Sequence, residues 1–157
     1  HQRSTFGRKR CPVVDGAAPW CQPPTLVAQA LRHFQRKQLI LNIFPSIDTG
    51  TCAASVRNFN KTAAALDNAL VICISRDLPF AQKRFCGAEG IENVVMLSDF
   101  KTGQFGKDYK LEILNGPLAG LHSRCIVIVN KEGNVVYTEQ VAETVEEPNY
   151  EAALAAL

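Results

Sequence analysis

Short apolar runs rich in branched residues recur along the chain and predict a buried β-sheet. Runs of this length that end at turn residues are typical of strands covered on both faces. The runs are residues 39–44, 69–74, 94–97 and 125–129. A fifth strand, 135–141, follows a segment whose asparagines and glycine indicate a hairpin turn, residues 130–134.

The pattern between the first two runs predicts a helix. Apolar residues spaced by three and four positions continue from Cys52 to Leu66. Thr49 or Thr51 is the expected N-cap. A strand–helix–strand unit over residues 39–74 implies two parallel strands joined by a right-handed crossover.

Three more helices are expected downstream. The second helix has Asp77 as its expected N-cap and Pro79 in its first turn, and Gly87 favours its end. A weaker helical stretch covers residues 103–109, and a closing helix covers 150–157. This order of elements predicts an α/β sandwich of the thioredoxin-like type, with a central mixed sheet and helices on both faces.

Composition and charge divide the chain unevenly. The 157 residues are 46% apolar and 20% charged, which suits a globular domain. Residues 1–40 hold seven bases and one acid, whereas residues 41–157 hold ten bases and fourteen acids. The start also contains prolines and shows no helical or strand period. We therefore expect a basic, proline-containing N-terminal segment, 1–38, that behaves as a flexible arm, and a folded domain, 39–157.

These features argue against nucleic acid and membrane as partners. The basic segment lacks the interleaved aromatic residues that would support nucleic-acid binding. The apolar runs fall far short of the roughly 20 residues that a membrane helix needs. The chain also shows no signal-type apolar core, which favours the cytoplasm over the periplasm.

The cysteines offer the first candidate chemistry. The six cysteines include no C-x-x-C pair and no Cys/His cluster, so a structural zinc site is not expected. Cys52 differs from the others because it falls on the first turn of a helix that follows a buried strand. Helix N-terminal N–H groups stabilise an anion there, and a thiolate is the nucleophile of peroxide reduction and disulfide exchange. A buried, inert thiol is the alternative interpretation.

Several segments together carry a family resemblance. Residues 45–52, P-S-I-D-T-G-T-C, closely resemble the active-site segment of the thiol peroxidase group of bacterial peroxiredoxins, of the atypical 2-Cys type. The likeness covers about residues 39–157. It continues through D-L-P-F-A-Q at 77–82, R-F-C-G-A-E-G at 84–90, G-P-L-A-G-L at 116–121 and E-P-N-Y at 147–150.

The resemblance implies roles for five residues. Cys52 is the expected peroxidatic cysteine, held with Thr49 and Pro45 around the peroxide oxygens. Cys86 is the expected resolving cysteine of the same chain. Arg124 is expected to reach the site, where its cation would favour a thiolate and donate hydrogen bonds to the peroxide.

The resemblance also implies a complete reaction. A thiol-specific peroxidase with the peroxiredoxin fold would reduce hydrogen peroxide and organic hydroperoxides through a sulfenic acid and an intrachain disulfide. Thioredoxin would recycle the enzyme, with no metal, haem or flavin, and the assembly would be a homodimer. Two other hypotheses stay open from the residues: a general dithiol oxidoreductase on the same fold, and a non-catalytic binding module.

Overall fold

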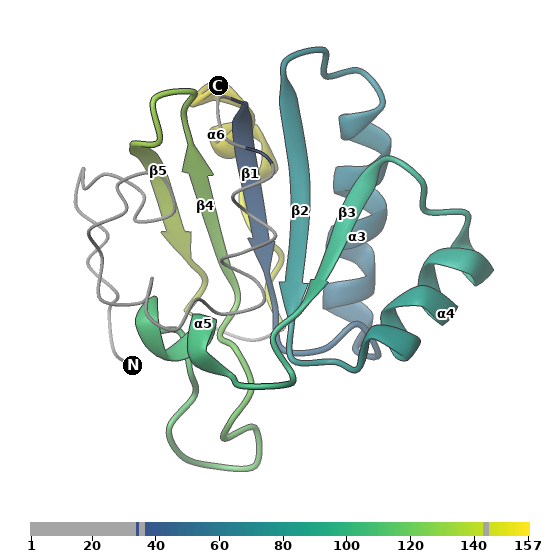
Figure 1. Cartoon of the computed structure of the whole chain (residues 1–157), viewed down its shortest axis with the longest axis vertical. Coiled ribbons are helices and arrows are strands. Elements are labelled where there is room, and N and C mark those ends of the chain that lie inside the picture. The colour runs from purple at the N-terminus through teal and green to yellow at the C-terminus, as the bar shows by residue number, and fades with distance from the viewer. Residues whose placement is uncertain (1–33, 35–36, 143–144) are drawn as a thin grey trace.

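A five-stranded mixed sheet forms the centre of the computed structural model, which describes residues 34, 37–142 and 145–157. The strands lie in the order β3-β2-β1-β4-β5 (Figure 1). β1, β2 and β3 are parallel, while β4 runs antiparallel to both β1 and β5. Their bounds are β1 Gln38–Ile43, β2 Ala69–Ser75, β3 Val94–Ser98, β4 Cys125–Val129 and β5 Val135–Gln140.

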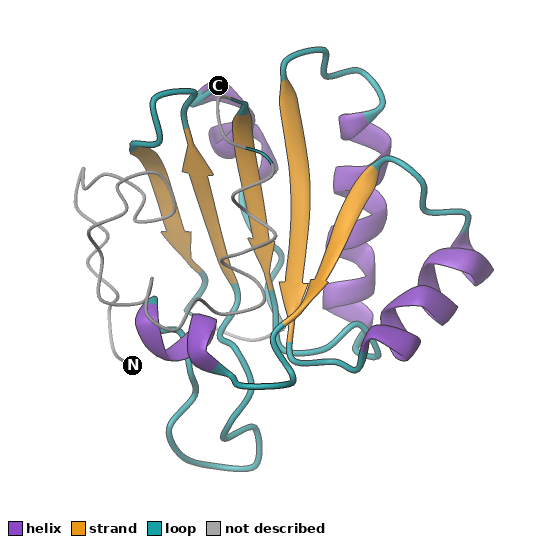
Figure 2. Cartoon of the chain, viewed as in Figure 1, coloured by secondary structure: helices purple, strands orange, loops and turns teal. Residues whose placement is uncertain are grey.

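Helices cover both faces of this sheet (Figure 2). The helices are α3 Gly50–Ala63, α4 Pro79–Glu89, α5 Gln104–Asp108 and α6 Tyr150–Ala155. One apolar cluster joins the sheet to side chains from α3, α4 and α6, among them Phe59, Phe85 and Ala153. A second cluster joins the opposite face to Phe105 of α5 and to Tyr109. The predicted thioredoxin-like sandwich is therefore confirmed.

Strand alternation decides which side chains meet each helix layer. Ile126 and Ile128 of β4 pack in the cluster that contains α3, whereas Cys125 and Val127 pack in the α5 cluster. Successive side chains of a strand point to opposite faces. Arg124, directly before β4, shares the parity of Ile126 and Ile128, so its side chain starts on the α3 side.

The predicted end of α4 at Gly87 is wrong. The helix continues to Glu89, and Gly90 is its C-cap with a positive φ of 65°. Glycine adopts this left-handed conformation without the steric penalty that other residues meet. A Cβ at Gly87 would have no atom within 4 Å, so this glycine occupies an ordinary, exposed helical position.

Two further helix predictions need correction. Leu78, not Asp77, is the N-cap of α4, because the Asp77 carboxylate binds the loop after β1 instead. α3 ends at Ala63 rather than Leu66, since the N–H groups of Ala65 and Leu66 bond three residues back, to Thr62 and Ala63, in a tighter turn.

Part of the predicted N-terminal segment, residues 1–33 with Cys11 and Cys21, lies outside the described residues. Within the described ranges, no helix has the length and apolar character that crossing a bilayer requires.

Two leucines near α5 give a matched test of the core. Leu111 is 1% exposed in the α5 cluster, whereas Leu114 is 65% exposed. Leu111→Ala should lower the free energy of unfolding by about 2–5 kcal/mol, because it leaves a cavity in a packed core. Leu114→Ala should change it by less than about 0.5 kcal/mol. Urea unfolding of the reduced protein measures both, and equal losses would contradict the packing described here.

Candidate active site

The sulfur of Cys52 faces the guanidinium of Arg124 inside the protein. Cys52 lies in the first turn of α3 and exposes no surface, and Arg124 is only 2% exposed. Nη2 of Arg124 donates to the Cys52 Sγ at 3.4 Å, across 72 positions of sequence. A buried guanidinium in this place can pair with negative charge that develops on the sulfur or on an oxygen bound to it.

Asp77 holds the loop that leads from β1 into α3. Its carboxylate accepts hydrogen bonds from the backbone N–H of Ile47 and the hydroxyl of Ser46, each at 2.7 Å. Pro45 is buried at the start of this loop. Thr49 occupies the N-cap position of α3, but its hydroxyl donates to the Ser46 carbonyl oxygen (2.9 Å) and makes no capping bond. The loop geometry thus depends on a carboxylate from the next strand–helix connection.

A buried amide supports the turn that carries Cys52. Asn42 is fully buried in β1, and its Nδ2 donates to Ser55 Oγ at 3.2 Å. The Ser55 hydroxyl in turn donates to the backbone carbonyl oxygen of Cys52 at 2.8 Å. The same Asn42 amide lies 3.6 Å from the Cys73 sulfur. Buried polar groups of this kind fix one packing arrangement when they are paired, so the first turn of α3 is tied to the centre of the sheet.

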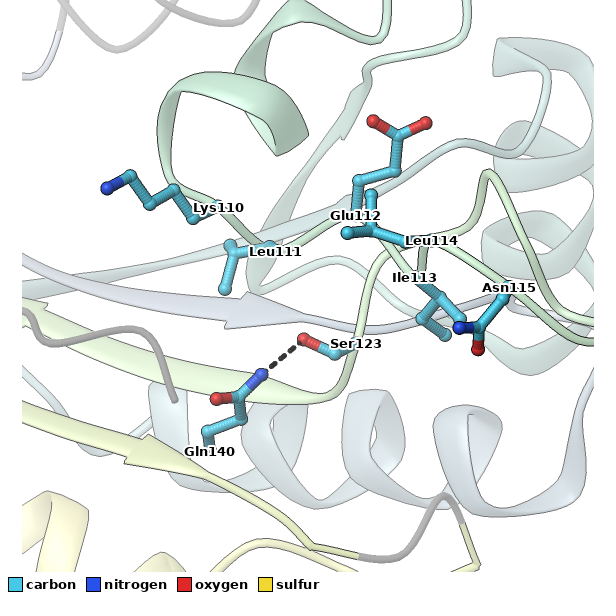
Figure 3. A pocket seen from close by; sticks show the side chains of 8 residues that line it. All are labelled: Lys110, Leu111, Glu112, Ile113, Leu114, Asn115, Ser123 and Gln140. Atoms are coloured by element: carbon cyan, nitrogen blue, oxygen red, sulfur yellow. Dashed lines mark hydrogen bonds between the residues drawn. The ribbon is translucent and has the colours of Figure 1, made fainter. Parts of the chain in front are cut away.

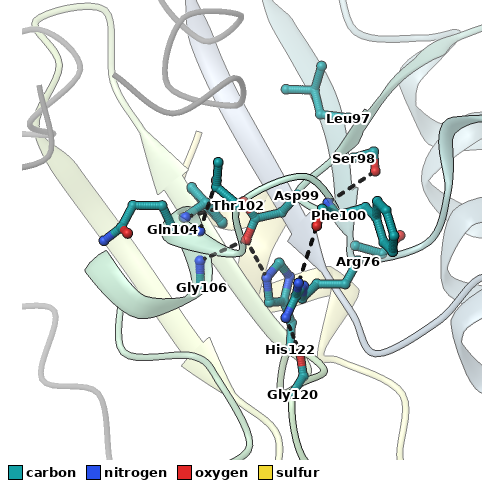
Figure 4. A network of polar contacts seen from close by, with 12 residues as sticks. Arg76, Leu97, Ser98, Asp99, Phe100, Thr102, Gln104, Gly106, Gly120 and His122 are labelled. Atoms are coloured by element: carbon teal, nitrogen blue, oxygen red, sulfur yellow. Dashed lines mark hydrogen bonds and ion pairs between the residues drawn. The ribbon is translucent and has the colours of Figure 1, made fainter. Parts of the chain in front are cut away.

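The segment that delivers Arg124 is anchored by a buried Asp–His pair (Figure 4). Nε2 of His122 lies 2.9 Å from Oδ2 of Asp99, and both side chains are at most 1% exposed. Asp99 also accepts the backbone N–H groups of Phe105 and Gly106 at the start of α5. Arg76 donates to the carbonyl oxygen of Gly120 at 3.0 Å. The Asp99 bond fastens the chain just before Arg124 to the loop after β3, and the Arg76 bond fastens it to the residue that follows β2.

Cys86 lies on α4 and is not bonded to Cys52. It is half-buried and packs against the apolar cluster that contains Cys52. Burial raises the pKa of its thiol above the ordinary value, so Cys86 is a neutral thiol at pH 7. The structure therefore describes a reduced protein in which the two sulfurs belong to neighbouring helices.

The remaining described cysteines are buried thiols. Cys73 and Cys125 are 0% and 1% exposed. Burial raises the pKa of each to about 12, which keeps both protonated at neutral pH. A protonated, enclosed thiol is a poor nucleophile.

A surface pocket lined by no cysteine is drawn in Figure 3. It has a volume of about 520 Å³ and none of the five predicted site residues lines it. Its lining residues are Lys110, Leu111, Glu112, Ile113, Leu114, Asn115, Ser123 and Gln140. Across the described ranges, no group of three or more His, Cys, Asp or Glu side chains is arranged to hold a metal ion.

Sequence reasoning placed some of this site and missed other parts. Cys52 and Arg124 are brought together as expected, whereas Thr49 bonds within its own loop and Cys86 stays on its helix. The loop-holding role of Asp77 was missed, although its position directly after a strand was a usable signal. Asn42, Asp99 and His122 were missed too, because neither a polar residue in an apolar run, such as Asn42, nor one in a loop, such as Asp99 or His122, reveals its distant partner.

Comparisons with known proteins agree with the geometry. The family model described as Redoxin matches residues 13–154. A thiol peroxidase of Mycobacterium bovis is 60% identical over 125 residues, which cover 80% of this chain and 74% of that protein, and one of Mycobacterium tuberculosis matches equally.

Solved structures show the same fold. A peroxiredoxin-like protein from Aquifex aeolicus has a TM-score of 0.74 at 37% identity, covering 78% of this chain and 71% of its own. Reduced Prx3 from Vibrio vulnificus has a TM-score of 0.71 at 27% identity, covering 81% and 84%. With a family model over most of its length and relatives at 60% identity, the chain belongs to the redoxin family, in the thiol peroxidase group of the peroxiredoxins.

Proposed function

We propose that this chain is a thiol-dependent peroxidase that reduces hydrogen peroxide and organic hydroperoxides. The observation that carries the proposal is the contact between Cys52 Sγ and Arg124 Nη2 on the first turn of a buried helix. A thiol in this position has both helix N–H groups and a guanidinium to stabilise negative charge. The similarity to mycobacterial thiol peroxidases supports the same activity.

In the first step the Cys52 thiolate attacks one oxygen of the peroxide. A sulfur–oxygen bond forms, the O–O bond breaks, and the second oxygen leaves as hydroxide or alkoxide and takes up a proton. Cys52 becomes a sulfenic acid, and the products are water or an alcohol. Because Cys52 exposes no surface, we propose that peroxide enters beside the exposed residues Asp48, Thr49 and Gly50.

Three residues are proposed to assist this step. Arg124 stabilises the charge on the departing oxygen, as preorganised donors do in other transition states. The Thr49 hydroxyl, which now donates to Ser46, turns to the peroxide oxygens. Pro45 is buried at the base of the loop and shields the sulfur from water.

In the second step Cys86 resolves the sulfenic acid. The Cys86 sulfur attacks the Cys52 sulfur, a disulfide forms, and the sulfenic oxygen leaves as water with the thiol proton. Two cysteine Cα atoms must lie within about 7 Å for a disulfide, and we propose that the end of α4 unwinds to bring Cys86 to Cys52. A dithiol protein such as thioredoxin then reduces the disulfide and is itself oxidised, and the cycle uses no metal, haem or flavin.

We further propose a homodimer in the cytoplasm, with residues 39–157 carrying the activity. Large apolar side chains stay exposed beside the site: Leu78 at 44%, Phe80 at 80% and Phe100 at 52%. The hydroxyl of Ser98 donates to the Asp77 carbonyl oxygen, which joins the two segments that carry them. An exposed apolar patch of this kind is typical of an association surface.

The assignment of the two cysteines is tested by replacing each. Cys52→Ser should abolish peroxide consumption with a thioredoxin system, because no other described thiol is both reactive and near Arg124. Cys86→Ser should complete one turnover and leave Cys52 as a sulfenic acid that dimedone traps. Peptide mapping of the wild type after one equivalent of peroxide should find a Cys52–Cys86 bridge. A bridge to Cys73, to Cys125 or to a second chain would overturn this assignment.

The role of Arg124 is tested by two substitutions at that position. Arg124→Gln should slow single-turnover oxidation of Cys52 by about 10²–10³-fold, the usual loss when one transition-state donor is removed. Arg124→Lys should give a rate between those of the wild type and Arg124→Gln, since lysine keeps the charge but lacks the planar fork of donors. Stopped-flow kinetics at low peroxide measures the rates. Circular dichroism confirms that both variants are folded, and a rate equal to wild type for Arg124→Gln would remove Arg124 from the site.

A further inference from the structure

We propose that two ion pairs, Arg84–Asp48 and Arg57–Glu89, act together as a latch on α4 and set how fast Cys86 reaches Cys52. The inference rests on the proposed function and concerns its second step. Asp48 and Arg57 belong to the loop and helix that carry Cys52, whereas Arg84 and Glu89 belong to α4. Arg57 and Arg84 are thus positioning residues for resolution, and neither touches the peroxide.

Few buried contacts hold the C-terminal part of α4 in place. Of its eleven residues, only Gln82 and Phe85 are buried, and no side chain caps its N-terminus. Gly87 lies inside the helix, where glycine costs about 1 kcal/mol relative to alanine. The residues that follow, up to Gly90, are exposed. Apolar burial in this part of α4 therefore comes from Phe85 and the half-buried Cys86, and residues 87–90 add none.

The two ion pairs attach this part of α4 to α3 and to the loop before it. Nη2 of Arg84 lies 2.7 Å from Oδ1 of Asp48. Arg57 makes a bidentate pair with Glu89, through Nε and Nη2, each at 2.9 Å. The guanidinium carbon of Arg57 also lies 5.8 Å from the ring centre of Phe85. The hydrogen bonds from Arg57 lower the pKa of Glu89 below its ordinary value of 4.5, so this pair stays charged at neutral pH.

Hydrogen bonds to neighbouring elements mark the limits of the segment that can open. At one end, Nε2 of Gln82 donates to Ser75 Oγ at 3.1 Å and to the Leu97 carbonyl oxygen at 2.9 Å. At the other end, the backbone N–H of Asn93 donates to Oδ1 of Asn60 on α3 at 2.8 Å. The latch and Cys86 both lie between these anchors, in residues 83–90. Within residues 83–90 only Phe85 is buried, so opening releases Cys86 at the cost of the Phe85 contacts with the core.

The strength of the latch matters because the sulfenic acid has two fates. It either condenses with Cys86 or reacts with a second peroxide to a sulfinic acid. Exposed ion pairs are individually weak and are screened by salt. Loss of one pair should therefore raise the rate of disulfide formation by about two- to five-fold. The sulfinic acid yield at a given excess of peroxide should fall accordingly.

Rapid quench and mass spectrometry of the full-length protein test this latch. Arg84→Gln, Asp48→Asn and Glu89→Gln should each form the Cys52–Cys86 disulfide about two- to five-fold faster after the sulfenic acid has formed. Lys83→Gln is the control, because Lys83 is an exposed α4 cation for which the structure records no ion pair. It should resolve at the wild-type rate. Asp48→Asn combined with Arg84→Gln should add nothing beyond either single change, since both remove the same pair.

The dependence of the resolution rate on salt distinguishes the latch from a purely structural role of these residues. Raising the ionic strength to about 1 M should speed resolution in the wild type and leave a variant lacking both pairs, Arg84→Gln with Glu89→Gln, unchanged. Equal disulfide rates in wild type and variants would overturn the latch alone. A bridge in the wild type that does not involve Cys86 would instead overturn the proposed second step. An increase in hydrogen exchange confined to residues 83–90 on loss of the pairs would support these residues as the segment that opens.

Discussion

The antiparallel register of β1 against β4 is the constraint on which the site depends. β1 lies at the middle of the sheet, and Ile43 at its end pairs with Cys125 at the beginning of β4. The chain leaves β1 towards the first turn of α3 at the point where Arg124 enters β4. A shift of this register by one residue would turn the Arg124 side chain to the α5 face. The contact between Arg124 and Cys52, 72 positions apart in sequence, is thus a property of strand pairing.

The sheet and its helix layers were predictable because their signals are local. Each strand is a short apolar run, and a fully buried strand needs apolar side chains on both faces. The position of Cys52 on the first turn of α3 followed in the same way, from the strand before it and the spacing after it. Gly87 misled the prediction for α4. A glycine at an exposed helical position looks like a stop signal, but the left-handed residue that ends the helix is Gly90.

The rest of the site depends on pairs that are distant in sequence. Asp77 looks like a helix cap when read locally, yet its carboxylate binds the Ser46–Ile47 loop some thirty positions earlier. Arg124 was placed near Cys52 by family resemblance alone, since no periodicity connects them. His122 has no local partner in the sequence, and only the folded chain reveals its bond to Asp99. Hydrogen bonds between separate elements satisfy buried polar groups, but a linear pattern does not identify the partners.

The close approach of α5 to His122 limits how this chain can change over evolution. A Cβ at Gly106 would lie 2.7 Å from two atoms of the His122 ring, so even alanine does not fit while the histidine is present. Replacing His122 by a smaller residue would open that space, but it would remove the one side chain that the structure records as bonded to the buried Asp99 carboxylate, leaving it the backbone N–H groups of Phe105 and Gly106. The residues at positions 99, 106 and 122 therefore constrain one another, and a change at one favours a change at the others. A lineage that leaves this arrangement by single substitutions must pass through an intermediate with either a steric clash at Gly106 or a buried Asp99 that has lost a hydrogen bond, and both lie close in sequence to Arg124 or to the loop that anchors it.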